Sequence, residues 1–323
     1  MPRILGLVSC IAIAGAACAV DDPAAAHHAL VSPTATVDVL AWSPAPSSLT
    51  SDRNSLYWID DADQTLVRMA KGGGSVAVLA RGVQGRTPWC IAVDAQHVYW
   101  LDIDDGAVRR LPLAGGAVET LATGEGDLYA IALDRSYVYW SSNGAGGGRV
   151  RRRSRWGGLP VTLASGSFFS TLVVDAWFVY AADAHVLAGA NQIIRVPRSG
   201  GAKVVMSADE DALGLAGAGN DLYWKRFWTG DVRRASKWLP GATTITDAGG
   251  GWGDLDVDAA YVWWSTGPIL HRVARSGGPG AIVAELPAWA NSIALDGGAA
   301  YLALDATDVD GEHVLGAIVR VRP

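Results

Sequence analysis

The stretch HVYWLDIDDGAVRRLPLAGG, residues 97–116, joins a tyrosine–tryptophan pair to an acidic cluster, two arginines and a Gly-Gly pair. Aligned on the aromatic pair, similar stretches read DRNSLYWID, DAQHVYWLD, DRSYVYWSS, DAWFVYAAD, GNDLYWKR, DAAYVWWST and DGGAAYLAL. The spacings between them run from 38 to 43 residues, and the second residue of each pair falls at Trp58, Trp100, Trp140, Ala181, Trp224, Trp264 and Leu302. A period of about 40 residues with several short strands per unit is typical of propeller blades.

Each unit predicts four antiparallel strands. The first is an alternating apolar run that ends in aspartate in six units, at Asp52, Asp94, Asp134, Asp175, Asp258 and Asp296. The second carries the aromatic pair, whose alternation sends its two side chains to opposite faces. The third carries an arginine in all seven units: Arg68, Arg110, Arg152, Arg195, Arg234, Arg272 and Arg320. Five residues later most units have glycine, which supplies the positive φ of a tight hairpin before the fourth strand.

The seventh unit lacks a fourth strand, because the chain stops at AIVRVRP. Residues 37–52, VDVLAWSPAPSSLTSD, align with a fourth strand followed by a first strand. We therefore expect residues 37–41 to pair with the strand around Ile318, which closes the ring and leaves no sheet edge exposed. The sequence thus predicts an all-β fold over residues 37–323, a seven-bladed β-propeller of four-stranded antiparallel blades whose N-terminal strand completes the last blade.

The N-terminal residues predict export. MPRILGLVSCIAIAGAACAV combines an early cation, Arg3, with an apolar run, which is typical of a secretory signal peptide. The stretch AGAAC resembles the lipobox of bacterial lipoproteins, so residues 1–18 are interpreted as a signal peptide and Cys18 as a lipidation site. Cleavage after Ala19 is the alternative, and residues 19–36 are interpreted as a flexible tether. We expect an outer-membrane or periplasmic lipoprotein, held to the membrane only through Cys18, or else a secreted protein.

The charge and cysteine content of the chain limit the kinds of partner and cross-link that we expect. A formal net charge of -6 disfavours a duplex nucleic-acid binder, which needs positive charge to neutralise phosphates. The run RVRRRSR, residues 149–155, is interpreted as a local solvated patch near the outer rim. Outside the signal peptide the only cysteine is Cys90, in an apolar run that predicts a small buried side chain. We expect a monomer that is held by its core and has no disulfide.

The repeats point to a family. LYWID and VYWLD, followed by an arginine and Gly-Gly, resemble the YWTD repeats of low-density-lipoprotein-receptor-type propellers and their exported bacterial relatives. Two departures stand out: threonine is replaced in every unit, and seven units are present where the receptor family typically has six. The resemblance implies a propeller that binds proteins or peptides and carries no catalysis. It also makes the once-per-unit aspartates, arginines and tryptophans structural, because each meets the same surroundings in every blade.

Aromatic residues gather in segments that do not repeat. The loops entering first strands and the fifth unit's loop, WKRFWTGD, are expected to meet around the central channel. Aromatics on a concave face anchor peptides or sugars, since they offer a large contact area at small entropy cost. The predicted binding residues are Trp89, Tyr129, Phe169, Trp228, Trp252 and Trp289. Their ligand would be a protein, a peptide or a glycan; in the alternative interpretation they pack the entrances between blades.

Acids and histidines in same-face loops supply two further hypotheses. Fragments such as DIDDG and DATDVDGE resemble calcium loops without the twelve-residue register that makes the motif specific. We therefore expect no cofactor, with calcium as the alternative at Asp102, Asp104, Asp305, Asp308 and Asp310. No catalytic motif appears, and we predict a protein that is not an enzyme. The rival is a propeller lyase or hydrolase that uses His185, His271 and His313.

Overall fold

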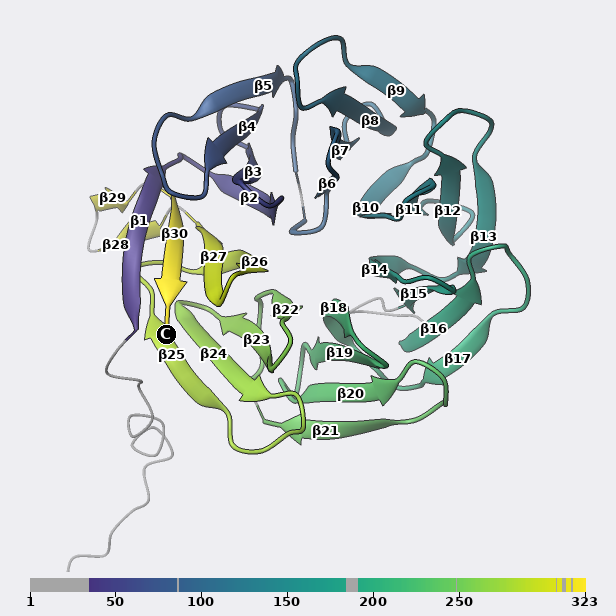
Figure 1. Ribbon diagram of the computed structural model, residues 1–323. Helices are drawn as coiled ribbons and strands as arrows, with labels where there is room; N and C mark the ends of the chain where they lie inside the picture. The colour runs from purple at the N-terminus through teal and green to yellow at the C-terminus, as the bar shows by residue number, and fades with distance from the viewer. Residues whose placement is uncertain are drawn as a thin grey trace, which may run out of the picture.

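The computed structural model describes residues 35–323 except 86, 184–190, 248, 306, 310–311 and 315, and describes only the backbone of 307–309 and 312–314. Within these ranges every regular element is a β-strand, and the strands form seven antiparallel four-stranded sheets arranged in a ring, together with one short hairpin (Figure 1). The predicted seven-bladed propeller is confirmed. None of the described elements is a helix that is long and apolar enough to cross a membrane.

The first four blades follow the chain in order, each running from the centre of the ring outward. Blade 1 contains β2 (Pro46–Ser51), β3 (Ser55–Asp60), β4 (Thr65–Ala70) and β5 (Ala77–Arg81). Blade 2 contains β6 (Ile91–Val93), β7 (His97–Asp102), β8 (Ala107–Pro112) and β9 (Glu119–Ala122). Blade 3 contains β10 (Asp127–Leu133), β11 (Tyr137–Asn143), β12 (Gly148–Ser154) and β13 (Val161–Gly166). Blade 4 contains β14 (Phe169–Val174), β15 (Phe178–Asp183), β16 (Gln192–Pro197) and β17 (Val204–Ser207).

The last three blades bring the chain back to its start. Blade 5 contains β18 (Ala212–Ala218), β19 (Asp221–Arg226), β20 (Val232–Ser236) and β21 (Ala242–Thr246). Blade 6 contains β22 (Leu255–Val257), β23 (Tyr261–Thr266), β24 (Ile269–Ala274) and β25 (Ala281–Glu285). Blade 7 contains β26 (Ala290–Asp296), β27 (Ala299–Leu304), β30 (Ala317–Arg322) and β1 (Thr36–Trp42). In chain order, the hairpin of β28 (Thr307–Val309) and β29 (Glu312–Val314) is inserted between β27 and β30, which pair directly with each other.

Strand β1 closes the ring. It pairs antiparallel with β30, with Val37 opposite Val321, Val39 opposite Val319 and Ala41 opposite Ile318. The first and the last strand that the structure describes therefore lie in one blade (Figure 1), as predicted, and β30 has a paired strand on both sides.

The repeated tryptophans form the core. Trp58, Trp100, Trp140, Trp224 and Trp264 are all buried. Trp140 donates its indole N–H to Glu125 Oε2 at 2.9 Å, and Trp224 donates to Glu210 Oε2 at 3.0 Å. Truncation of a buried tryptophan side chain typically lowers the free energy of unfolding by about 3–5 kcal/mol, so this residue stabilises each of the five blades that have it.

The repeated aspartates and arginines are structural, as predicted. Asp134 accepts the backbone N–H groups of the following turn with one carboxyl oxygen, at 2.6 and 2.8 Å, and the hydroxyl of Tyr139 with the other, at 2.6 Å. The arginines reach across to the next blade: Arg110 donates to the carbonyl of Arg155 at 2.8 Å, and Arg152 donates to the carbonyl of Arg198. These two residue types therefore fix the turns and join neighbouring blades.

Candidate functional site

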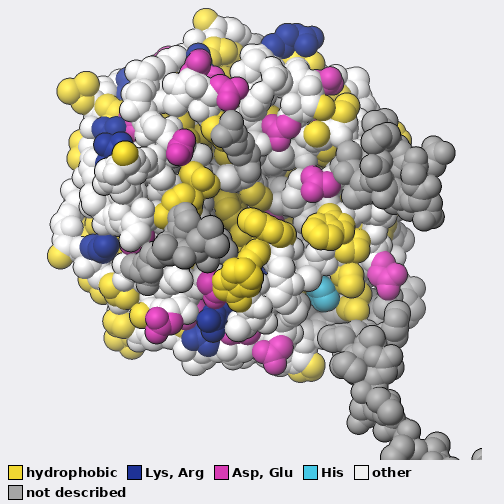
Figure 2. Space-filling view, turned by 180° about the vertical axis from the view of Figure 1, so that it is seen from behind, with side chains coloured by type: hydrophobic (Ala, Val, Ile, Leu, Met, Phe, Trp, Pro, Cys, Tyr) yellow, Lys and Arg dark blue, Asp and Glu magenta, His cyan; other side chains and the backbone are white. Residues whose placement is uncertain are grey.

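A cavity of about 610 Å³ lies at the centre of the ring. All seven blades contribute to its wall, through their first strands, the segments that enter these strands and some loops between second and third strands. Figure 2 views the side of the ring opposite to Figure 1, where hydrophobic side chains gather around a central hollow. We call this space the central cavity, and its described lining residues are Ser47, Ser48, Asp61, Gly85, Thr87, Pro88, Trp89, Tyr129, Phe168, Ser170, Ala212, Leu213, Trp252, Gly253, Gly267, Trp289, Ala290, Asn291 and Asp305.

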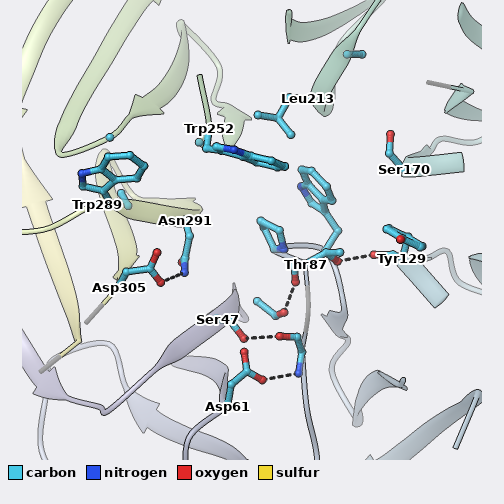
Figure 3. A pocket seen from close by; sticks show the side chains of 18 of the residues that line it. Ser47, Asp61, Thr87, Tyr129, Ser170, Leu213, Trp252, Trp289, Asn291 and Asp305 are labelled. Atoms are coloured by element: carbon cyan, nitrogen blue, oxygen red, sulfur yellow. Dashed lines mark hydrogen bonds between the residues drawn. The ribbon is translucent and has the colours of Figure 1, made fainter. Parts of the chain in front are cut away.

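Four of the predicted binding aromatics line the central cavity: Trp89, Tyr129, Trp252 and Trp289. Figure 3 shows Trp289 and Tyr129 on opposite sides of it. The indoles of Trp252 and Trp289 remain 61% and 53% exposed, although they stand at the centre of the molecule. Trp228 is not a lining residue; its ring packs edge-on against Phe227 at 4.8 Å, and Phe227 packs against Trp252 at 5.0 Å. Trp228 thus belongs to an aromatic cluster beside the mouth.

Phe169 is a correction to the predicted set. Its side chain is completely buried in the core of blades 3 and 4, so it cannot meet a ligand. Its neighbour Phe168 lines the cavity instead and packs edge-on against Tyr129 at 4.6 Å. Adjacent residues of an extended chain point to opposite sides, and Phe169 N–H is fixed by Asn143 Oδ1 at 2.9 Å, which turns Phe169 inward.

Irregularities in the first strands decide which side chains enter the cavity. The registers of β2, β10, β14 and β26 shift between Ser47 and Thr50, Leu128 and Ile131, Phe169 and Thr171, and Ala290 and Ser292. The residues inside these shifts include Ser48, Tyr129, Ser170 and Asn291, and all four line the cavity. A β-bulge re-aims a side chain that regular alternation would place elsewhere. Sequence reasoning missed Ser48, Ser170 and Asn291, because no local signal marks a bulge.

Two carboxyl groups, Asp61 of blade 1 and Asp305 of blade 7, lie at the cavity wall (Figure 3). Asp61 Oδ1 accepts the backbone N–H of Gly85 at 2.6 Å, and Asp305 Oδ1 accepts Asn291 Nδ2 at 2.5 Å. Burial raises the pKa of both carboxyls, and the negative charge of Asp305 contributes to the rise in the pKa of Asp61. Two half-buried carboxyls from adjacent blades therefore share one polar side of an otherwise aromatic cavity.

Two more acids lie behind the wall: Asp254 directly precedes the first strand of blade 6, and Asp256 is on that strand. Asp254 accepts the indole N–H of Trp89 at 3.0 Å and the backbone N–H of Ile293 at 3.0 Å, which fixes the indole and joins blades 6 and 7. Asp256 accepts the N–H of Leu295 at 3.1 Å. Burial raises the pKa of Asp254 to about 6 and of Asp256 to about 7. Their alternation in GWGDLDVD was the available signal in the sequence.

Trp252 stands on a glycine-rich loop that leaves little room for side chains. A Cβ on Gly253 would lie 2.1 Å from the carbonyl oxygen of Ser265, so only glycine fits there. Lys225 is buried beneath the loop and donates to the carbonyl of Gly251 at 3.0 Å and to Thr266 Oγ1 at 3.2 Å. Burial lowers the pKa of Lys225 to about 8. This cation positions the loop that carries Trp252.

Of the three histidines of the catalytic alternative, the structure describes the side chain of His271 alone. His271 lies on β24, does not line the central cavity, and stacks on Trp264 with ring centroids 5.1 Å apart. His185 lies outside the described residues, and only the backbone of His313 is described. The His/Asp site thus stays a prediction.

The calcium alternative also stays a prediction. Asp102 forms an ion pair with Arg109 at 2.7 Å, and Asp104 lies in the turn that follows β7. Asp305 lines the central cavity, whereas the side chain of Asp308 and all of Asp310 lie outside the described part of the chain. Over the described ranges, no three His, Cys, Asp or Glu side chains gather in a group that could hold a metal ion.

Comparison with known proteins identifies the fold and no family. No protein-family model and no curated protein matches the sequence. Among solved structures, a streptogramin B lyase matches with a TM-score of 0.72 and 10% identity, over 89% of this chain and 97% of that chain. A gluconolactonase from Xanthomonas campestris matches with 0.55 and 16% identity, over 92% of both chains. A chain of a nidogen/laminin complex matches with 0.53 and 15% identity, over 68% of this chain and 89% of that chain.

At these identities the likenesses show the propeller fold alone. Enzymes and a protein-binding complex both appear among them, so function has to be argued from the cavity itself.

Proposed function

We propose that this protein is a non-enzymatic binding propeller that takes its ligand, a peptide or glycan or a segment of a protein, into the central cavity. The observation that carries the proposal is the convergence of aromatic side chains from five blades on one cavity: Trp89, Tyr129, Phe168, Trp252 and Trp289. A cavity of about 610 Å³ lined by aromatic groups and a few polar ones has the size and chemistry of a ligand site.

Exposure favours binding over packing for two of these residues. An indole that served only to fill the space between blades would be buried, whereas Trp252 and Trp289 keep more than half of their surface exposed, at 61% and 53%. Both would gain by burial against a ligand, since tryptophan is enriched among the residues that dominate binding energy. Trp89 differs, because its hydrogen bond to Asp254 also joins blades.

The experiment uses peptide and glycan arrays probed with the labelled protein and with the double variant Trp252→Ala, Trp289→Ala. Truncating an anchor residue typically costs about 2 kcal/mol or more, so binding should weaken by at least about thirtyfold. Trp177→Ala is the matched control, because Trp177 is 66% exposed in the β14–β15 turn and does not line the cavity.

All variants should have the melting temperature of the parent protein, because the substituted indoles are largely exposed. A double variant that binds as the parent does would refute the proposal, and so would an absence of any array ligand for the parent. A double variant that unfolds would favour the packing interpretation.

The cellular setting and the repeat class are further parts of this proposal. We propose that the chain is exported and anchored through Cys18, so that the cavity meets its ligand at the cell envelope. The repeats are proposed to be of the YWTD-like kind. The Asp–Tyr hydrogen bonds in blades 1–4 and the arginines that reach the next blade support this reading, because both rest on the residues that carry the resemblance.

A further inference from the structure

We infer that the ligand of the central cavity presents an organic cation, an alkylammonium or guanidinium group, to Asp61 and Asp305 between the aromatic rings. This inference rests on the proposed function and deepens it by naming the chemical class of the ligand. The shared chemistry could come from a small free amine or from a lysine or arginine side chain of a peptide.

Among the described residues, the two carboxyls lack the arginine partner that Glu125 and Glu210 have. Glu125 is paired with Arg151 at 2.6 Å and Glu210 with Arg233 at 3.2 Å, each within its own blade. Asp61 and Asp305 accept hydrogen bonds from neutral groups only, and no ion pair joins either of them to a described Lys, Arg or His side chain. An acid that is half-buried and unpaired is stabilised by a cation brought by a ligand.

The charged side chains among the described lining residues are both acids, Asp61 and Asp305. Among the lining residues that the structure describes, none is a lysine, arginine or histidine; Arg86 lies outside that set. Asp254 and Asp256 add two acids behind the wall, each held by backbone N–H groups. Clefts lined by charge of one sign with apolar walls focus the field and attract the opposite charge. The described part of the cavity lining is therefore electrostatically suited to a cation.

The aromatic walls fit the same ligand. Cations bind over the faces of tryptophan and tyrosine through the ring quadrupole, and sites for quaternary ammonium groups are built from several such rings. Trp252 and Trp289 offer exposed indoles, and Tyr129 faces them from the other side (Figure 3). A neutral ligand would use the rings and leave the two carboxyls without a counter-charge.

The affinity for a cation should depend on pH, because the pKa values of Asp61 and Asp305 are raised. A bound cation favours the ionised carboxyls, so binding should strengthen as pH rises through the range in which Asp61 and Asp305 lose their protons. A neutral ligand that uses only the rings would show no such rise.

The test compares a cation with its neutral isostere. Choline and 3,3-dimethylbutan-1-ol have nearly the same shape and differ in charge. Binding of each is measured by calorimetry and by tryptophan fluorescence at pH 4 and pH 7.5. An N-acetylated and C-amidated Gly-Lys-Gly peptide forms a second arm; its only cation is the lysine side chain, so it distinguishes a side-chain cation from a free amine. We expect choline or the peptide to bind at least about tenfold more tightly than the neutral alcohol at pH 7.5, with the difference reduced at pH 4.

Asp61→Asn with Asp305→Asn removes both charges and keeps an acceptor oxygen for Gly85 and Asn291. This double variant should lose the preference for the cation and keep the parent's melting temperature. Asp63→Asn is the matched control, because Asp63 is an exposed acid two residues from Asp61 that does not line the cavity.

Equal binding of choline, peptide and alcohol by the parent would overturn the inference, as would a double variant that still prefers the cation. If the arrays find a ligand that depends on Trp252 and Trp289 while no cation is preferred, the proposed function survives and the cation inference fails. If no probe and no array ligand binds, both fail.

Discussion

Removal of strand β1 should destabilise the whole ring. The strand is paired with β30 at six positions. On β30, Ile318, Val319 and Val321 are completely buried, on both faces of the strand. At about 0.5–1.5 kcal/mol for each backbone hydrogen bond, the loss of roughly six bonds costs on the order of 3–9 kcal/mol. Since domains are stable by about 5–15 kcal/mol, this is a large fraction of the total.

The comparison uses a chain that begins at residue 43 and a control that begins at residue 35, which keeps β1 (Thr36–Trp42) and Ser43. Cutting before Ser43 leaves the acceptor of the Trp58 indole N–H in place at 2.9 Å, so only the strand is removed. Calorimetry and urea unfolding followed by near-UV circular dichroism give the melting temperature and the free energy of unfolding. We expect the melting temperature to fall by about 10 °C or more. Equal stabilities of the two chains would refute ring closure as a source of stability.

Three further predictions concern other parts of the chain. Glu125→Ala leaves the indole of Trp140 and the guanidinium of Arg151 without their shared acceptor, so urea unfolding should show a loss of about 3–5 kcal/mol, and Glu125→Gln should lose less. Lys225 has a native pKa of about 8 against an unfolded value near 10.5; the unfolded chain therefore binds more protons between these values, and this residue's contribution to stability should rise with pH in that window. Melting curves at pH 7.5 and pH 10 should show that rise in the parent, and Lys225→Met should lack it. Cys18→Ser should abolish incorporation of labelled palmitate in cells if Cys18 is the lipidation site; unchanged labelling would place the lipid elsewhere.

The fold could be predicted because its determinants are local and repeated. The second-strand tryptophan recurs in five units, the aspartate before it in six and the arginine after it in all seven, at spacings of about 40 residues. Several of these residues make the same kind of contact in successive blades. Even the closure by residues 37–41 follows from counting strands, because an unpaired edge is costly.

The site could be predicted only in part. Four of the residues that line the cavity could be predicted, because they are aromatic residues that do not recur in every unit and precede or begin a first strand: Trp89, Tyr129, Trp252 and Trp289. Phe169 was misassigned because a shift of one residue along a strand moves a side chain from the cavity to the core. The register shift next to Phe169 cannot be recognised in the sequence.

The sequence by itself determined the number of blades, their four strands and the way the ends meet, since periodic patterns fix which residues pair with their neighbours along the chain. Only the tertiary structure decided which side chains converge on the centre. Ser48 and Asp61 of blade 1 lie far from Asn291 and Asp305 of blade 7 in the chain, and the two pairs meet because the ring closes. Bulges turn Ser48 and Asn291 toward the cavity. Proximity of that kind depends on the geometry of the whole ring, which no local pattern contains.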